Sequence, residues 1–255
     1  MMYQSPRIAE SEMDDAYRAL DDYRRYPEME TSKRGLFAGK IRGLRRERTL
    51  PPLGAFLDIG ASHGAMLDAV RTWLPGWSLS AVEISPSARA SLAARGYTVA
   101  NAWESLDPEI KFDWINLDNV LEHMPDPLHV LKGLRRHLKP GGFVYIDLPN
   151  ESFFSLRYRM NNLARGFPKP PTFPGHVNLF TPRTLRKLIA LAGYRPERFW
   201  LESVSAPYRL EGCLGAVETP RIRAILRVLR LTRIDIALRT AYFLCARIEP
   251  ADAPR

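Results

Sequence analysis

The chain has 255 residues, 45% of them hydrophobic, and a formal net charge of +9 at pH 7. This is enough to bury a sizeable core, and it suits one α/β domain with insertions better than two independent domains. Isolated Cys213 and Cys245 argue against a disulfide scaffold or a zinc site. Because no signal peptide and no run of eighteen apolar residues is found, we expect a cytoplasmic protein that does not span a membrane.

Residues 1–52 predict a helical leader before the first strand. A polar helix over Ser11–Tyr26 ends at Pro27, and a basic helix over Lys33–Arg48 has one apolar face. The basic helix holds seven lysines and arginines and one glutamate, whereas acids outnumber Lys and Arg ten to four over Gly54–Val130. The acidic part suits a cationic ligand. The basic flanks either meet an anionic partner, such as nucleic acid or lipid headgroups, or are solvated helix faces.

The stretch from Phe56 to Met66 reads as a buried strand that turns abruptly into a helix. Gly60 and Gly64 have the G-x-x-x-G spacing, which differs from the G-x-G-x-x-G of dinucleotide-binding folds. Asp58 stands before the first glycine, where its carboxylate would repel a pyrophosphate and attract an ammonium or a sulfonium. A nicotinamide oxidoreductase is therefore disfavoured.

A second strand, Ser78–Glu83, ends in an acid 25 residues beyond Asp58. That separation is typical of a βαβ unit that delivers a carboxylate to a ribose. The alternative for Glu83 is an acid at the surface end of a strand. The next helix opens at Ser85-Pro86 and stops at Gly96.

The sequence predicts a short third strand over 96–100. A fourth strand follows, and its exit loop is Leu121-Glu122-His123-Met124-Pro125-Asp126-Pro127. A turn of the form L-x-P-G-G lies over 138–142. Phe143–Leu148 follows as the fifth strand. These motifs, with Asp58-x-Gly60-x-x-x-Gly64, resemble class I S-adenosylmethionine (SAM) dependent methyltransferases. The resemblance covers residues 54–150 closely and 176–195 loosely.

The resemblance implies a Rossmann-like α/β fold: a seven-stranded sheet of order 3-2-1-4-5-7-6, with strand 7 antiparallel and helices on both faces. It implies SAM as cofactor, and it implies that the leader, residues 1–52, folds over the cofactor pocket as a lid. The implied cofactor-binding residues are Asp58, Gly60, Ala61, Gly64, Glu83, Ile84, Ala102, Trp103, Asp118, Asn119 and Val120. Trp103 either stacks on the purine or belongs to the core, and the family's usual adenine-binding aspartate is missing at this point.

On the acceptor side, residues 149–181 predict a cap rich in aromatic residues and prolines. Asn150 either binds substrate or caps a turn. His176 is the leading candidate for a catalytic base and a substrate contact, with a structural role as the alternative. His123 is a second candidate base, although in the resembling motif it more often holds the loop together. No metal is expected.

A sixth strand over Glu197–Val204, a basic helical insertion over 206–238 and a closing strand over Ala241–Arg247 complete the domain predicted for residues 53–255. The insertion either docks on an anionic membrane surface or packs on the sheet or a dimer partner. The expected activity is methyl transfer to a small-molecule or glycan acceptor, at a hydroxyl group. The alternatives are a methyltransferase or binding protein acting on RNA, and an inactive SAM-binding domain.

Overall fold

The fold is described by a computed structural model, which covers residues 2–3, 37–38, 40–42, 44–45, 50–149, 176–202 and 241–248. Asn150, residues 150–175 of the predicted cap, the basic insertion over 206–238 and the polar helix of the leader lie outside these residues. The lid, cap and membrane-docking roles predicted for those segments therefore stay predictions.

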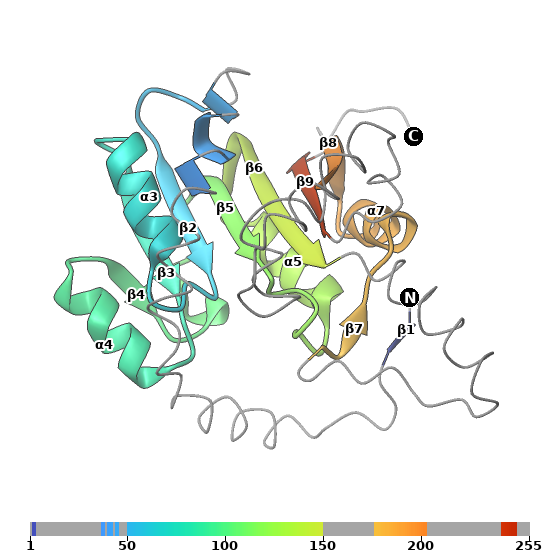
Figure 1. The fold of residues 1–255 in the computed structure, drawn as a ribbon, viewed down its shortest axis with the longest axis horizontal. Coiled ribbons are helices and arrows are strands. Elements are labelled where there is room, and N and C mark those ends of the chain that lie inside the picture. The colour runs from blue at the N-terminus through green and yellow to red at the C-terminus, as the bar shows by residue number, and fades with distance from the viewer. Residues whose placement is uncertain are drawn as a thin grey trace, which may run out of the picture.

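Seven strands form the main sheet (Figure 1). They are β2 (Ala55–Ile59), β3 (Ser78–Val82), β4 (Thr98–Ala100), β5 (Phe112–Asp118), β6 (Leu138–Pro149), β8 (Tyr194–Glu202) and β9 (Ala241–Ile248). The spatial order is β4-β3-β2-β5-β6-β9-β8, and β9 runs antiparallel to both of its neighbours. The predicted Rossmann-like order, with an antiparallel seventh strand, is confirmed.

In the described part of the chain, four α-helices and one short 3-10 helix lie between the strands. They are α3 (Ala65–Trp73), α4 (Pro86–Ala94), η2 (Trp103–Ser105), α5 (Pro127–Arg135) and α7 (Pro182–Leu191). Three of the α-helices begin with proline at the first position, directly after a residue whose side chain caps the helix: Ser85, Asp126 and Thr181. These caps accept hydrogen bonds from backbone N–H groups that lack a partner within the helix, which fixes where each helix begins.

A small second sheet joins the start of the chain to the acceptor side. β1 (Met2–Tyr3) pairs antiparallel with β7 (Asn178–Leu179), directly after His176. The sequence does not predict this pairing, because two-residue strands leave no periodic pattern. It brings the N-terminus beside the segment that leads into α7.

Alternating side chains divide the core between the two faces of the sheet. On one face, Phe56, Trp114, Phe143 and Tyr145 pack against α3, α4 and Phe37, Ile41 and Leu44 of the leader. On the other face, apolar residues of the same strands pack against α5 and α7. Within the leader, Phe37, Ile41 and Leu44 are at most 3% exposed, so this basic helix contributes to the core of the domain.

Trp114 lies at the centre of the first face. Its ring is edge-on to Phe56 at 4.8 Å and stacked on Phe143 at 5.7 Å, and Trp77 and Tyr145 complete the group. Such pairs add about 0.5–1.5 kcal/mol each beyond the burial of their area. This packing fixes the strands whose carboxyl ends carry the candidate site.

His137, at the entrance to β6, is buried in its neutral form. Nδ1 lies 3.1 Å from the carbonyl oxygen of Ile110, and Nε2 lies 3.3 Å from Nε of Arg136, which donates to it. These partners fit a tautomer that donates from Nδ1 and accepts at Nε2. Burial is the main cause that lowers the pKa of His137 below its usual value, and the Arg136 guanidinium adds to it.

We therefore expect the protein to lose stability below the pKa of an unfolded histidine. As pH falls through about 6.5, the unfolded chain takes up a proton at this position before the folded chain does, which costs up to about 1.4 kcal/mol per pH unit. Urea denaturation from pH 8 to pH 5 measures the free energy of unfolding. In His137→Gln the slope below pH 6.5 should be shallower than in wild type, and equal slopes would contradict the neutral, buried assignment.

Candidate functional site

The turn after β2 is built around Gly60. Its φ of 71° is favoured by glycine, and its N–H donates to the carbonyl oxygen of Val82 at 2.8 Å. A Cβ on Gly60 would lie 2.8 Å from Cγ2 of Val120, in the loop that leaves β5. Ala61 is buried and also donates to Val82. The turn is thus packed tightly between the ends of β3 and β5.

Gly64 lies where α3 meets α4, and its predicted contact with a cofactor stays a prediction. A Cβ here would lie 2.5 Å from side-chain atoms of Leu92 and Arg95. Its φ is 84°, and the α3 helix begins directly after it. Gly64 therefore allows α3 to pack closely against α4, which is a structural role.

Glu83 holds the Gly60 turn from the end of β3. Its Oε2 accepts the Ser62 N–H at 2.6 Å, and its Oε1 accepts the Ser85 N–H at 2.8 Å. The side chain is buried, with the residue 8% exposed. A carboxylate offers about four lone-pair sites, so these two bonds orient the group and leave further acceptor capacity on the same two oxygens. The geometry suits a carboxylate that accepts hydrogen bonds from two neighbouring hydroxyl groups.

The residues expected around the adenine separate into two groups. Ile84 is 52% exposed beside Glu83, and Ala102 is half-buried, so both are accessible to a ligand. Trp103 is 7% exposed, and a Cβ on Gly133 of α5 would lie 2.0 Å from its ring. The ring also lies edge-on to His129 of α5. This packing favours the core role of Trp103 over purine stacking.

Asp58 is more deeply placed than a surface-facing acid would be. It is 3% exposed, and its Oδ1 accepts a hydrogen bond from Nδ2 of Asn116 at 2.8 Å. Asn116 is opposite Asp58 in the register of β2 and β5. The contact ties these central strands together at the polar end of the face that carries Trp114. Its role toward an ammonium group stays a prediction.

Next to this pair, the structure places a lysine that the sequence does not identify. Nζ of Lys40 lies 2.7 Å from Oδ2 of Asp147 and 3.6 Å from Oδ2 of Asp118, at the ends of β6 and β5. The side chains are 6%, 1% and 14% exposed, in that order. A buried cation therefore joins the leader helix to both strands.

The loop after β5 starts with a strained residue. Asn119 has a φ of 54°, its N–H donates to the carbonyl oxygen of Asp147 at 2.9 Å, and its Nδ2 donates to Oδ1 of Asp118 at 2.6 Å. These bonds turn the chain sharply at the end of the strand and lead it to Val120, against Gly60. Asp118, Asn119 and Val120 thus lie together at the carboxyl end of β5, beside the Gly60 turn.

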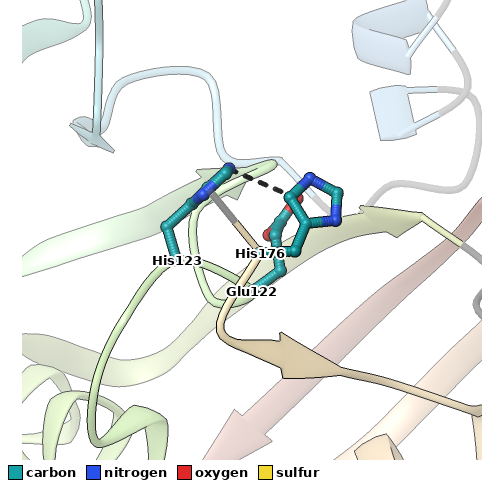
Figure 2. Close-up of side chains that lie close together, drawn as sticks. All are labelled: Glu122, His123 and His176. Carbon is teal, nitrogen blue, oxygen red and sulfur yellow. Dashed lines mark ion pairs between the residues drawn. The ribbon is translucent and has the colours of Figure 1, made fainter. Parts of the chain in front are cut away.

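Two residues later, the loop brings a glutamate and a histidine against a distant histidine. Figure 2 shows Glu122 and His123 from this loop together with His176, which precedes β7. Nε2 of His123 lies 4.0 Å from Oε1 of Glu122, and the two imidazole rings are 4.9 Å apart at an angle of 82°. The two histidines predicted as candidate bases are therefore neighbours in space.

Sequence reasoning missed Lys40, Asp147, Asn116 and Glu122 as parts of the site. One signal was present for Lys40. It follows Phe37 by three residues and precedes Leu44 by four, so helical spacing places it on the apolar face of its helix. Asn116 and Asp147 stand two residues after Trp114 and Tyr145, so strand periodicity places them on the face of these aromatic residues. Glu122 lies in the loop after β5, where no such periodicity applies.

A family model described as a methyltransferase domain matches residues 32–198, about two thirds of the chain. The chain belongs to this methyltransferase family. The matched region includes Lys40 and ends within β8, so it contains the ends of β2, β3, β5 and β6 that carry the candidate site. No curated protein sequence matches the methyltransferase significantly.

Solved structures show the same fold at low sequence identity. A SAM-dependent methyltransferase from Archaeoglobus fulgidus is 17% identical, with 84% of this chain and 93% of that chain covered and a TM-score of 0.55. One from Thermotoga maritima is 18% identical, with 93% and 100% covered and a TM-score of 0.58. Phosphoethanolamine N-methyltransferase 2 from Haemonchus contortus, solved with S-adenosyl-L-methionine, is 17% identical, with 92% and 60% covered and a TM-score of 0.54.

The methyltransferase is thus a SAM-dependent transferase with the fold expected from its sequence motifs. Among its described residues, no helix is long and apolar enough to cross a membrane.

Proposed function

We propose that the protein transfers the methyl group of SAM to a hydroxyl of a small-molecule or glycan acceptor, at the carboxyl ends of β2, β3 and β5. The observation that carries this proposal is the Glu122–His123–His176 cluster beside the exit of β5. A sulfonium methyl group is already activated, so a hydroxyl acceptor requires mainly alignment and loss of its proton. Two imidazoles next to a buried carboxylate suit that second task.

In this proposal, Glu83 accepts hydrogen bonds from the two ribose hydroxyls of SAM. Its carboxylate is already held by the backbone N–H groups of Ser62 and Ser85, so little side-chain freedom would be lost on binding. The exposed Ile84 offers an apolar surface to the adenine, and the turn at Gly60 and Ala61 passes beside the sugar and methionyl parts. Brändén's rule for open α/β sheets supports a ligand at these strand ends.

The methionyl part would lie toward Asp58 and the loop of Asp118, Asn119 and Val120. The acidic character of this region complements the ammonium and the sulfonium. In the transfer step, the acceptor oxygen forms a bond to the methyl carbon while the S–CH₃ bond breaks, and its electron pair stays on sulfur. The hydroxyl proton passes to solvent at the Glu122–His123–His176 cluster.

Labelled SAM tests this proposal. The purified full-length protein is incubated with methyl-labelled SAM and, separately, with fractions of small molecules, glycans, RNA and protein from a cell extract. We expect label in the small-molecule or glycan fraction as an O-methyl ether, which mass spectrometry after hydrolysis identifies. Label only in RNA or protein, or only on nitrogen, would contradict the proposed acceptor. SAM binding without any transfer would point to an inactive SAM-binding domain.

A further inference from the structure

We propose that Glu122, His123 and His176 bind one divalent metal ion, and that this ion activates the acceptor hydroxyl. The purpose assigned to the ion rests on the proposed function, whereas the site itself rests only on the geometry. The sequence gives no reason to expect a metal, because His176 is far along the chain from the other two residues.

The first argument is convergence. One ligand atom from each of the three side chains lies within 4.8 Å of the other two. Glu122 is 1% exposed, whereas His123 and His176 are half-buried, so the cluster has one deep ligand and two that border solvent. Figure 2 shows the side chains directed toward one another from two separate segments.

The second argument is that the backbone holds the two segments together. The N–H groups of Val177 and Asn178 both donate to the carbonyl oxygen of Glu122, at 2.9 and 3.0 Å. The Asn178 side chain is fully buried and donates from Nδ2 to the carbonyl oxygen of Met124 at 2.6 Å. These three bonds hold the backbone on both sides of the cluster. The fold therefore sets where the backbone of the three residues lies.

The donor set indicates the kind of ion. Imidazole nitrogens suit Zn²⁺, Fe²⁺, Ni²⁺ and Cu²⁺, and a carboxylate oxygen is acceptable to all of them. A nearby cation also stabilises a buried carboxylate such as that of Glu122. Two histidines and one carboxylate therefore suit a borderline ion such as Zn²⁺ or Fe²⁺ better than Mg²⁺ or Ca²⁺, which prefer sites made only of oxygens.

The distances fit a site that closes slightly on its ion. Ligand bonds of about 2.0–2.2 Å to a tetrahedral Zn²⁺ hold donor atoms roughly 3.4 Å apart. The 4.0 Å between Nε2 of His123 and Oε1 of Glu122 must therefore shorten by about half an ångström, and a separation at the 4.8 Å limit of the cluster by about 1.4 Å. The side chains would have to rotate toward the ion to reach these distances.

Three protein ligands leave at least one coordination position open, as in catalytic metal sites. The acceptor hydroxyl would take that position, where the ion lowers its pKa and its proton is released to solvent water. The alkoxide oxygen then forms the bond to the methyl carbon as the S–CH₃ bond breaks. His123 and His176 act in this scheme as ligands, and neither is the base.

Metal binding is tested without any acceptor. Tag-free, full-length protein is stripped with EDTA, dialysed, and titrated with Co²⁺, whose visible spectrum reports nitrogen coordination, and with Zn²⁺ by calorimetry. We expect one ion per chain in wild type. We expect affinity to fall at least about 10–100-fold in each of His123→Ala, His176→Ala and Glu122→Gln.

His129→Ala is the matched control. This histidine is exposed, and it lies on α5 against Trp103 and takes no part in the cluster. It should bind Co²⁺ as wild type does. Unchanged thermal unfolding and SAM affinity show that the variants are folded. Wild-type protein that binds Co²⁺ no more tightly than His176→Ala would overturn the proposal.

Activity assays then separate this inference from the proposed function. If EDTA abolishes transfer to a hydroxyl and Zn²⁺ or Fe²⁺ restores it, both stand. If transfer proceeds equally with EDTA, the metal proposal fails while the proposed function stands. Stoichiometric binding of Co²⁺ without transfer to any hydroxyl would support the metal site. It would contradict both the proposed acceptor and the purpose assigned to the ion.

Discussion

Replacing Glu83 with alanine is expected to weaken SAM binding about 10²–10⁴-fold. Each hydrogen bond from a ribose hydroxyl to this carboxylate contributes about 1.5–3 kcal/mol, and two such bonds are lost together. The substitution also removes the acceptor that Ser62 and Ser85 share, so the Gly60 turn loses one of its supports. Isothermal titration calorimetry with SAM measures the loss.

Glu104→Ala is the control for this experiment. Glu104 is an exposed acid at η2, so its removal changes the net charge equally without touching the proposed ribose site. Its affinity for SAM should match that of wild type. If Glu83→Ala also bound SAM with wild-type affinity, the ribose contact assigned to Glu83 would be wrong.

Replacing Lys40 with methionine is expected to lower the free energy of unfolding by about 3–5 kcal/mol, because it leaves the buried carboxylate of Asp147 and the partly buried carboxylate of Asp118 without this cation. Nζ lies 2.7 Å from Asp147, and both side chains are almost fully buried. Methionine keeps most of the volume of the lysine stem, so lost packing contributes little. Chemical denaturation followed by circular dichroism measures the change.

The chain offers a matched ion pair at the surface. Nζ of Lys139 also lies 2.7 Å from its partner, Asp113, but the lysine side chain is 41% exposed. Because exposed pairs contribute only about 0–1 kcal/mol, Lys139→Met should cost at most that amount. Equal losses in the two variants would show that burial does not decide the contribution of Lys40.

Much of the sheet was predictable because its signals are local. Buried strands followed by glycine turns or acids mark β2 and β3, and proline after a capping residue marks the helix starts. The strand order came from the family resemblance and is confirmed. Boundaries were less accurate: β6 starts at Leu138, five residues before its expected start at Phe143, because Leu138 pairs with Phe112.

The site was only partly predictable, because its contacts join distant segments. Strand ends alone indicate Asp58, Glu83 and Asp118, but they do not reveal that Lys40 crosses to Asp118 and Asp147. The same holds for His123 and His176, which meet only because backbone bonds join their segments. Pairings of this kind leave no periodic pattern, whereas a lysine at a core-facing helix position is a signal that deserves weight.

A crystal structure of the full-length protein with S-adenosylhomocysteine tests the central claim most directly. Our account predicts both ribose hydroxyls within hydrogen-bond distance of the Glu83 carboxylate, the adenine against Ile84 and the amino-acid end toward Asp58 and Asp118. A nucleoside bound away from the ends of β2 and β3, with Glu83 still occupied only by Ser62 and Ser85, would contradict it.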